Sequence, residues 1–215
     1  CGVKQNRHHA DDVGMHTLMV VDALHPRDPV LRLIGLLHDL GKPVTRAWDE
    51  SREDYTFYNH EVVGARLARK IMGRLRFSTR DMERAELLTR VHMHHIQPDI
   101  SKKTVRRWLS RMGSELFRSF LRLRIADRLG NRKQSHDLEP GLYEVVRMLR
   151  QIERDRDALS LKDLKINGND LLQRGIPEGP QIGRILNELL ELVLEYPDLN
   201  QREILLERVA SRSAD

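Results

Sequence analysis

The chain has 215 residues, of which 40% are hydrophobic, and a formal net charge of +5. This length suffices for one large helical domain or for a domain with a smaller appendage. A single cysteine excludes an internal disulfide framework, so we expect a cytoplasmic protein, and no apolar run approaches the roughly 20 residues of a membrane span. The positive charge favours a polyanionic partner, although from charge alone a solvated arginine-rich surface is the better explanation.

The first two predicted helices each carry a histidine on their apolar face. The apolar stripe of residues 13–24 includes His16, and the stripe of residues 30–37 continues to His38, which Asp39 follows. Gly41 and Pro43 predict that the second helix ends there. Burying an imidazole and a carboxylate is costly unless both find a partner, and a divalent cation accepts both ligand types. Other potential ligands on the apolar faces of predicted helices are therefore expected to converge on this pair.

A polar segment and two more helices follow. Residues 44–59 show neither a helical nor a strand period and predict a loop that covers or shapes the site. His60 opens a helix over residues 60–75. Ser78 predicts a helix start, and that helix places His92 and His95 on its inward face, with His94 looking away. We rank His92 first and His95 second as ligands.

The next two helices add a basic row and an acid. Residues 101–112 predict a helix with Lys103, Arg107 and Arg111 along one side, a row that usually means a solvated face but can also grip phosphates. The helix over residues 115–129 has an apolar stripe that ends on Asp127, so another inward position carries a metal-compatible side chain.

The remaining chain predicts further helices at residues 141–158 and 180–193, and a final helix to about residue 210 that is capped by Asn200. No strand alternation is visible. The sequence therefore predicts an all-α fold, a helical bundle in residues 1–135 with a C-terminal helical extension in residues 136–215. The helices of residues 180–213 also offer a surface for homodimerisation.

Five predicted helices thus carry a potential ligand on their apolar stripes. One histidine on an apolar face is more often a satisfied core residue, but five independent exceptions are improbable unless they meet. Imidazole and carboxylate without thiolate suit Mn²⁺, Fe²⁺, Co²⁺ or Ni²⁺, with Mg²⁺ possible and structural Zn²⁺ less suited. Lys42 either holds a phosphate or complements the dipole of the helix end, and the sequence does not decide between the two. The five residues are His16, His38, His60, His92 and Asp127.

The arrangement of His16, the doublet His38-Asp39 and Asp127 resembles the HD superfamily of metal-dependent phosphohydrolases. The doublet lies in Leu36-Leu37-His38-Asp39-Leu40-Gly41-Lys42-Pro43. The flanking motifs resemble, more narrowly, the HD portion and C-terminal part of bacterial CCA-adding enzymes and poly(A) polymerases. These motifs include Tyr58-Asn59-His60-Glu61, Val105-Arg106-Arg107-Trp108-Leu109 and Ile166-Asn167-Gly168-Asn169-Asp170-Leu171.

The resemblance implies an enzyme in which His16, His38, Asp39 and Asp127 hold one metal ion. His60 and His92, with His95 as runner-up, match the additional histidines of two-metal members, in which Asp39 bridges the ions. It also implies hydrolysis of a phosphoester such as a 2′,3′-cyclic nucleotide. For such a metal site we expect that metal-bound hydroxide attacks the phosphoester and that Lys42 or a nearby arginine steadies the developing charge. The nucleotidyltransferase head of the family has no counterpart in this sequence, so nucleotide addition belongs to a longer parent protein.

The sequence also allows an alternative function. In this alternative the chain is a non-catalytic RNA-binding or structural module, with a relic HD site and tRNA or another RNA as its partner. The basic residues that would contact the RNA backbone are Lys102, Lys103, Arg106, Arg107 and Arg111.

Overall fold

The computed structural model describes residues 2–5, 11–131 and 139–212. It is helical apart from one small hairpin, which confirms the predicted all-α class. None of the described helices is long and apolar enough to cross a membrane. The chain forms two compact units, and each unit is made of two segments that are separated in the sequence. The first comprises the described parts of residues 1–98 and 115–143, and the second those of residues 99–114 and 144–215. The predicted boundary near residue 135 stays a prediction.

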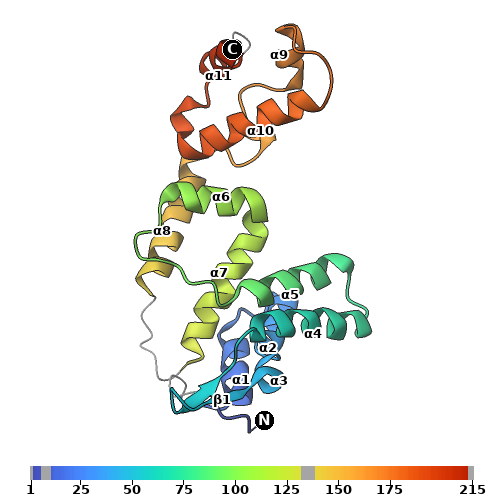
Figure 1. The fold of residues 1–215 in the computed structure, drawn as a ribbon, viewed down its shortest axis with the longest axis vertical. Helices are drawn as coiled ribbons and strands as arrows, with labels where there is room; N and C mark the ends of the chain where they lie inside the picture. Colours follow the sequence, from blue (N-terminus) through green and yellow to red (C-terminus); the bar gives the residue numbers. More distant parts are fainter. Residues whose placement is uncertain (1, 6–10, 132–138, 213–215) are drawn as a thin grey trace. The chain divides into compact units, whose positions relative to one another are not determined.

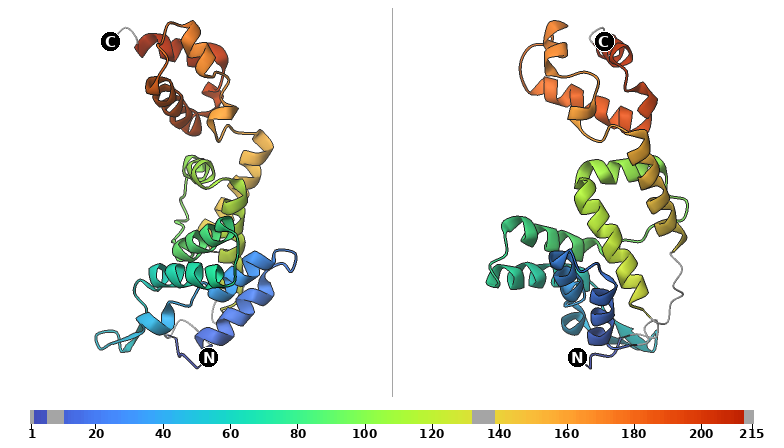
Figure 2. Two further views of the ribbon diagram at one scale, coloured as in Figure 1. Left: turned by 90° about the vertical axis from the view of Figure 1, so that its right-hand side faces the viewer. Right: turned by 180° about the vertical axis from the view of Figure 1, so that it is seen from behind.

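The first unit is built on α1 (Val13–Ala23), α2 (Pro29–Leu37), α4 (His60–Arg74) and α5 (Thr79–Val91). Helices α1 and α2 pack on each other, and α4 and α5 run side by side in every view (Figure 1, Figure 2). Side-chain oxygens of Asp12, Asp28 and Ser78 accept backbone N–H groups at the starts of α1, α2 and α5. These caps fix where the helices begin, and therefore which residues lie at their ends.

Small and branched apolar side chains fill the core of the first unit. Val20 and Ile34 are fully buried where α1 meets α2, and Ala65 and Ala68 are fully buried on α4. Alanine at this spacing lets α5 approach α4 closely. The long helix α7 (Ser114–Leu129) adds Phe117 and Leu123 to the buried set.

The segment predicted as a loop over residues 44–59 is partly ordered secondary structure, so that prediction is wrong in detail. A short helix α3 (Lys42–Thr45) follows Gly41, with Pro43 in its first turn. Strands β1 (Ala47–Asp49) and β2 (Asp54–Thr56) then pair antiparallel, with Trp48 opposite Tyr55 and their ring centroids 5.1 Å apart. Strands of three residues are too short for a period of two to be visible in a sequence.

The second unit contains α6 (Lys102–Met112), most of α8 (Pro140–Asp155), α9 (Gly168–Gln173), α10 (Pro180–Glu195) and α11 (Arg202–Arg212). Its core gathers Leu189 and Val193 of α10, Leu171 of α9 and Leu205 of α11. Asn200, the predicted cap of the last helix, instead bonds Lys165 N and Asp163 O, while Gln201 O accepts from Leu205 N. A helix capped by Asn200 would begin at residue 201, so α11, which begins at Arg202, starts one residue later than predicted.

Candidate metal centre

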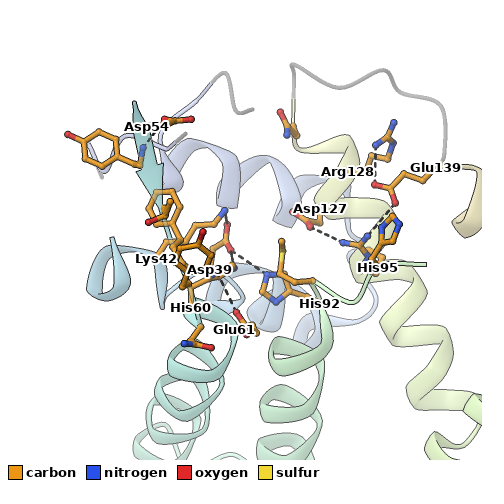
Figure 3. Close-up of a pocket in the computed structure, with 18 of the residues that line it drawn as sticks. Asp39, Lys42, Asp54, His60, Glu61, His92, His95, Asp127, Arg128 and Glu139 are labelled. Atoms are coloured by element: carbon orange, nitrogen blue, oxygen red, sulfur yellow. Dashed lines mark hydrogen bonds and ion pairs between the residues drawn. The ribbon is translucent and has the colours of Figure 1, made fainter. Parts of the chain in front are cut away.

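Six polar side chains converge in the first unit, and we call them the hub. His16 comes from the middle of α1, and Asp127 from the last turn of α7. His38 stands directly after α2. His92 stands directly after α5, and His60 opens α4 (Figure 3). Helix ends thus deliver three of the histidines. The hub consists of His16, His38, Asp39, His60, His92 and Asp127, all buried except Asp127, which is partly buried.

Each hub histidine uses Nδ1 to bind a backbone carbonyl. His38 Nδ1 lies 2.7 Å from Gly35 O, and His60 Nδ1 lies 2.7 Å from Phe57 O. His92 repeats the pattern with the carbonyl of Thr89 at 2.6 Å, and His16 does so with that of Gly130 at 3.2 Å. A carbonyl oxygen can only accept, so Nδ1 carries the proton and Nε2 of a neutral ring presents its lone pair. This arrangement is typical of histidines that bind metal ions.

Asp39 lies at the centre of the hub. Its Oδ1 is 3.6 Å from His60 Nε2 and 3.5 Å from His92 Nε2. Its Oδ2 is 3.4 Å from His38 Nε2 and 3.7 Å from His16 Nε2. Two ligands on one ion with bonds of about 2.0–2.2 Å lie roughly 3 to 3.5 Å apart. The spacing therefore suits one ion on each side of the Asp39 carboxylate.

Asp127 completes the set on one side of Asp39. Its Oδ1 is 3.0 Å from His16 Nε2 and 3.5 Å from His38 Nε2. Two overlapping groups have ligand atoms close enough together to hold an ion. They are His16, His38 and Asp127, and His38, Asp39 and His92.

Several hub atoms lack a hydrogen-bond partner among the described residues. They are the Nε2 atoms of His38, His60 and His92, and Oδ1 of Asp39. A buried polar atom without a partner costs about 1–3 kcal/mol, so four in one place need an explanation. Lone pairs of three imidazoles and a carboxylate, all facing one point, fit a divalent cation.

The charges of the hub favour a cation at its centre. Burial alone would lower the pKa of His38, but Asp39 and Asp127 together raise that pKa to about 9. Burial opposes ionisation of Asp39, but the positive charges of His38 and Lys42 hold the pKa of its carboxyl well below the usual range. Without a metal ion the two carboxylates thus favour a proton on His38 Nε2, and a divalent cation held by the same carboxylates would replace that proton.

Lys42 lies inside the site. Its buried Nζ is 2.6 Å from Asp39 Oδ2 and donates to Gln5 Oε1 at 2.7 Å. The side chain therefore faces the hub, and Lys42 begins α3 where the sequence had placed it at a helix C-terminus. Of the two alternatives that the sequence left open, this position is compatible with phosphate binding.

Gly41 lets the doublet approach α4. A Cβ at this position would lie 2.0 Å from the backbone oxygen of His60 and 2.8 Å from the backbone nitrogen of Gly64. Both obstacles are backbone atoms, which cannot rotate away. Only glycine therefore allows the turn after His38-Asp39 to sit against the start of α4.

A cavity of about 730 Å³ opens beside the hub. Its lining includes Tyr58, Arg124, Arg128 and Glu139, which sequence reasoning missed (Figure 3). The arginines stand three residues before and one residue after Asp127, so they share a helix face at i, i+4. This spacing of two arginines around Asp127 is the feature of the sequence that could have predicted their place beside the site. His95 also lines the cavity, but α5 ends at Val91, so the predicted helical continuation to His95 is wrong.

The predicted RNA-contacting residues of α6 belong to the second unit, whereas the hub residues belong to the first. Lys102 pairs with Asp155, Lys103 with Glu195 and Arg107 with Glu191. Arg106 is buried, pairs with Asp157 and donates to the carbonyl of Leu194. Arg111 is exposed. Contact of this row with RNA stays a prediction.

In this helical domain, histidines and aspartates from several helices meet at one buried point. These features are typical of helical proteins with a histidine–aspartate metal centre. The family model described as HD domain matches residues 7–138. The chain belongs to the HD domain family, which confirms the superfamily inferred from the His38-Asp39 doublet.

The relatives also confirm the narrower resemblance. The chain is similar to the CC-adding tRNA nucleotidyltransferase of Thermus thermophilus, with 33% identity over 90% of the chain and 44% of that protein. The A-adding tRNA nucleotidyltransferase of Deinococcus radiodurans is 30% identical over 88% of the chain and 44% of its own length. A multifunctional CCA protein of Methylococcus capsulatus is 28% identical over 85% of the chain and 41% of that protein. The chain thus spans less than half the length of these relatives.

Proposed function

We propose that the chain is a metal-dependent phosphohydrolase module of a tRNA-processing protein. The observation that carries the proposal is the set of unpartnered lone pairs around Asp39, because a divalent ion satisfies all of them at once. The proposed ligands of one ion are His16, His38, Asp39 and Asp127. His60 and His92, with Oδ1 of Asp39, would hold a second.

The bound ion, of which Mn²⁺, Fe²⁺, Co²⁺, Ni²⁺ and Mg²⁺ fit the ligand types, supplies charge to phosphoryl oxygens and acidifies water. The chain's own residues do the positioning. The carbonyls of Gly35, Phe57 and Thr89 hold the rings of His38, His60 and His92 through Nδ1, so each Nε2 stays aimed at Asp39. Lys42 Nζ, fixed between Asp39 and Gln5, is placed to contact an oxygen of the substrate phosphate.

The proposed substrate is a phosphoester of a nucleotide, such as a 2′,3′-cyclic nucleotide. The cavity beside the hub is large enough for a nucleotide, and the tRNA nucleotidyltransferase relatives support a role next to tRNA. Nucleotide addition, if the chain is part of a longer protein like these relatives, would be the work of that protein.

The test is hydrolysis of a 2′,3′-cyclic nucleotide and of a chromogenic phosphodiester by the protein loaded with each candidate metal. Asp39→Ala should lose both the metal and the activity, because it removes the carboxylate that faces both ligand groups. His94→Ala is the matched control, an exposed histidine two residues from a hub ligand. Equal turnover by wild type and Asp39→Ala would overturn the proposal. RNA binding without turnover under any metal would instead favour the non-catalytic alternative.

A further inference from the structure

A tight turn before α4 carries an exposed tyrosine two residues from a hub ligand. Phe57 O accepts the backbone N–H of His60 at 3.2 Å, which closes the turn over residues 57–60. Asn59, the third residue of the turn, has φ 60° and ψ 18°, the left-handed conformation that a type II turn requires there and that asparagine tolerates. The second residue is Tyr58. The local sequence therefore fixes Tyr58 just before the start of α4.

The turn is anchored on the hub. His60 Nδ1 lies 2.7 Å from Phe57 O, and His60 Nε2 lies 3.6 Å from Asp39 Oδ1 (Figure 3). Two residues span at most about 7 Å of backbone, so the Cα atoms of Tyr58 and His60 lie within that distance of each other. A group bound on Tyr58 would therefore be a neighbour of a phosphate bound at the hub.

Tyr58 also lines the cavity beside the hub. Tyr55 and Phe57 line it as well, but both are partly buried, and the Arg46 guanidinium covers the Tyr55 ring at 3.5 Å from the ring centroid. Tyr58, in contrast, is 62% exposed. Among the tyrosine and phenylalanine residues that line the cavity in the described part of the chain, Tyr58 is thus the most accessible to a ligand.

The ring of Tyr58 has only a weak contact with an arginine. The Arg52 guanidinium lies 6.0 Å from the ring centroid, at the outer limit of cation–π attraction, and Arg52 Nε also pairs with Asp49 Oδ2 at 3.5 Å. A guanidinium covers at most one of the two faces of a ring. Stacking of a nucleobase on an aromatic ring is more favourable than a cation–π contact at an exposed site, so a base is the better partner for this ring.

We propose that Tyr58 stacks on the nucleobase of the substrate, and that this contact makes the cavity select a nucleotide over a phosphate ester that has no base. The inference rests on the proposed function for the position of the phosphate at the hub. Because Tyr58 and His60 belong to one turn, the base and the phosphate can belong to one nucleotide. Every base has a π-face, so the selection is for nucleotides as a class and not for one base.

The test compares two ligands that resist hydrolysis and differ only in the base, in protein loaded with Mn²⁺. They are the 3′-phosphonate analogues of adenosine 3′-monophosphate and of the methyl riboside that carries no base. Calorimetry measures the ratio of their dissociation constants, riboside over nucleoside. We expect a ratio of about ten in the wild type, which is within the range for one stacked base. Tyr58→Ala should lower the ratio to near one.

Two further variants separate stacking from a structural role. Tyr58→Phe keeps the aromatic ring and should keep the wild-type ratio. Tyr143→Ala removes an exposed tyrosine of the same unit that does not line the cavity, and it should also keep the ratio. Thermal unfolding shows whether each variant is folded, which we expect because both tyrosines are exposed.

A ratio near one in the wild type, or an unchanged ratio in folded Tyr58→Ala, would overturn the stacking role. Failure of the wild type to bind either ligand would also overturn it. These outcomes are separate from the proposed function. Hydrolysis of a 2′,3′-cyclic nucleotide together with a ratio near one keeps the hydrolase and rejects the inference. A ratio that depends on Tyr58, without hydrolysis under any metal, keeps the inference and rejects the hydrolase.

Discussion

The hub and the basic row of α6 (Lys102, Lys103, Arg106, Arg107 and Arg111) are both rich in polar side chains. They differ in how many of those side chains have a hydrogen-bond or ion-pair partner within the fold. In the hub, Nε2 atoms of three buried histidines face a buried carboxylate without a hydrogen-bond partner among the described residues. On α6, Lys102, Arg106 and Arg107 each meet a carboxylate of the same unit. The hub therefore has bonding capacity left for a ligand, whereas most of the row uses its charge within the fold.

This difference shows why net charge is a weak guide to function and buried polarity a stronger one. A surface arginine can find an acidic neighbour at little cost, and such pairs contribute little to stability. A buried histidine or aspartate has few ways to be satisfied, so its position restricts what the protein can bind. The variants below test this contrast, from the largest expected effect to the smallest.

Arg106 should be the most sensitive member of the basic row. Its side chain and that of Asp157 are almost fully buried, so Arg106→Ala leaves an unpaired buried carboxylate. Breaking a buried pair in this way costs about 3–5 kcal/mol of unfolding free energy. Arg107→Ala is the matched control on the next residue, because the Arg107–Glu191 pair is partly exposed and should contribute less than about 1 kcal/mol to stability.

Denaturant unfolding of the two variants measures the contrast. Equal and small losses of unfolding free energy in both variants would mean that the Arg106–Asp157 pair does not stabilise the fold. The whole basic row would then again be a candidate RNA-binding surface. Equal losses of RNA affinity without loss of stability would have the same meaning.

Gly41→Ala should damage the hub through the backbone. The added Cβ meets the backbone oxygen of His60, so the turn after Asp39 must move away from α4. We expect a loss of about 3 kcal/mol of unfolding free energy, the upper range for overpacking, together with weaker metal binding. Gly183→Ala, where a Cβ meets nothing within 4 Å, is the control. It should leave the metal content unchanged and should not lower the unfolding free energy, because alanine is about 1 kcal/mol more favourable than glycine inside a helix such as α10. A stable Gly41→Ala protein with full metal content would contradict this account of the turn.

Asp28 gives a smaller, pH-dependent effect from a satisfied ion pair. Partial burial raises the pKa of Asp28, but the hydrogen bond from Arg84 and that from the backbone N–H of Leu31 lower it below the ordinary value overall. A lowered folded-state pKa stabilises the protein above the unfolded-state value of about 3.9, and this stabilisation is lost as pH falls through the folded-state pKa. Asp28→Asn keeps a capping oxygen and removes the charge.

We therefore expect Asp28→Asn to cost about 1 kcal/mol at pH 7, with the difference from wild type shrinking below about pH 4. Urea unfolding at pH 7, 5 and 3 measures it. A difference that is constant with pH would show that the Arg84 pair does not stabilise the native state.

The hub was largely predictable from sequence because each ligand interrupts an apolar helical stripe. His16, His38, His60, His92 and Asp127 were all found in this way, and the structure brings them together around Asp39. A side chain at a helical spacing has only one direction to point, so periodicity predicts burial. Their roles as metal ligands stay predictions.

Three features were not predictable for physical reasons. The hairpin around Trp48 and Tyr55 has strands of three residues, which are too short for a period to show. The approach of Gly41 to His60 is a contact between backbones of different elements, and no local pattern encodes it. The pairing of Arg106 with Asp157 depends on which acidic residue folds back onto α6, and charge in a sequence does not reveal its partner.

Metal content tests the central claim most directly. The purified chain is loaded with Mn²⁺, freed of unbound ion by gel filtration and assayed by elemental analysis, together with His38→Gln and the control His94→Gln. We predict one or two ions per chain in the wild type and in His94→Gln, and a loss of at least one ion in His38→Gln, because His38 Nε2 lies among Asp39 and Asp127. A wild type that retains no ion, or a His38→Gln protein that retains as much as the wild type, would contradict the account of the hub as a metal centre.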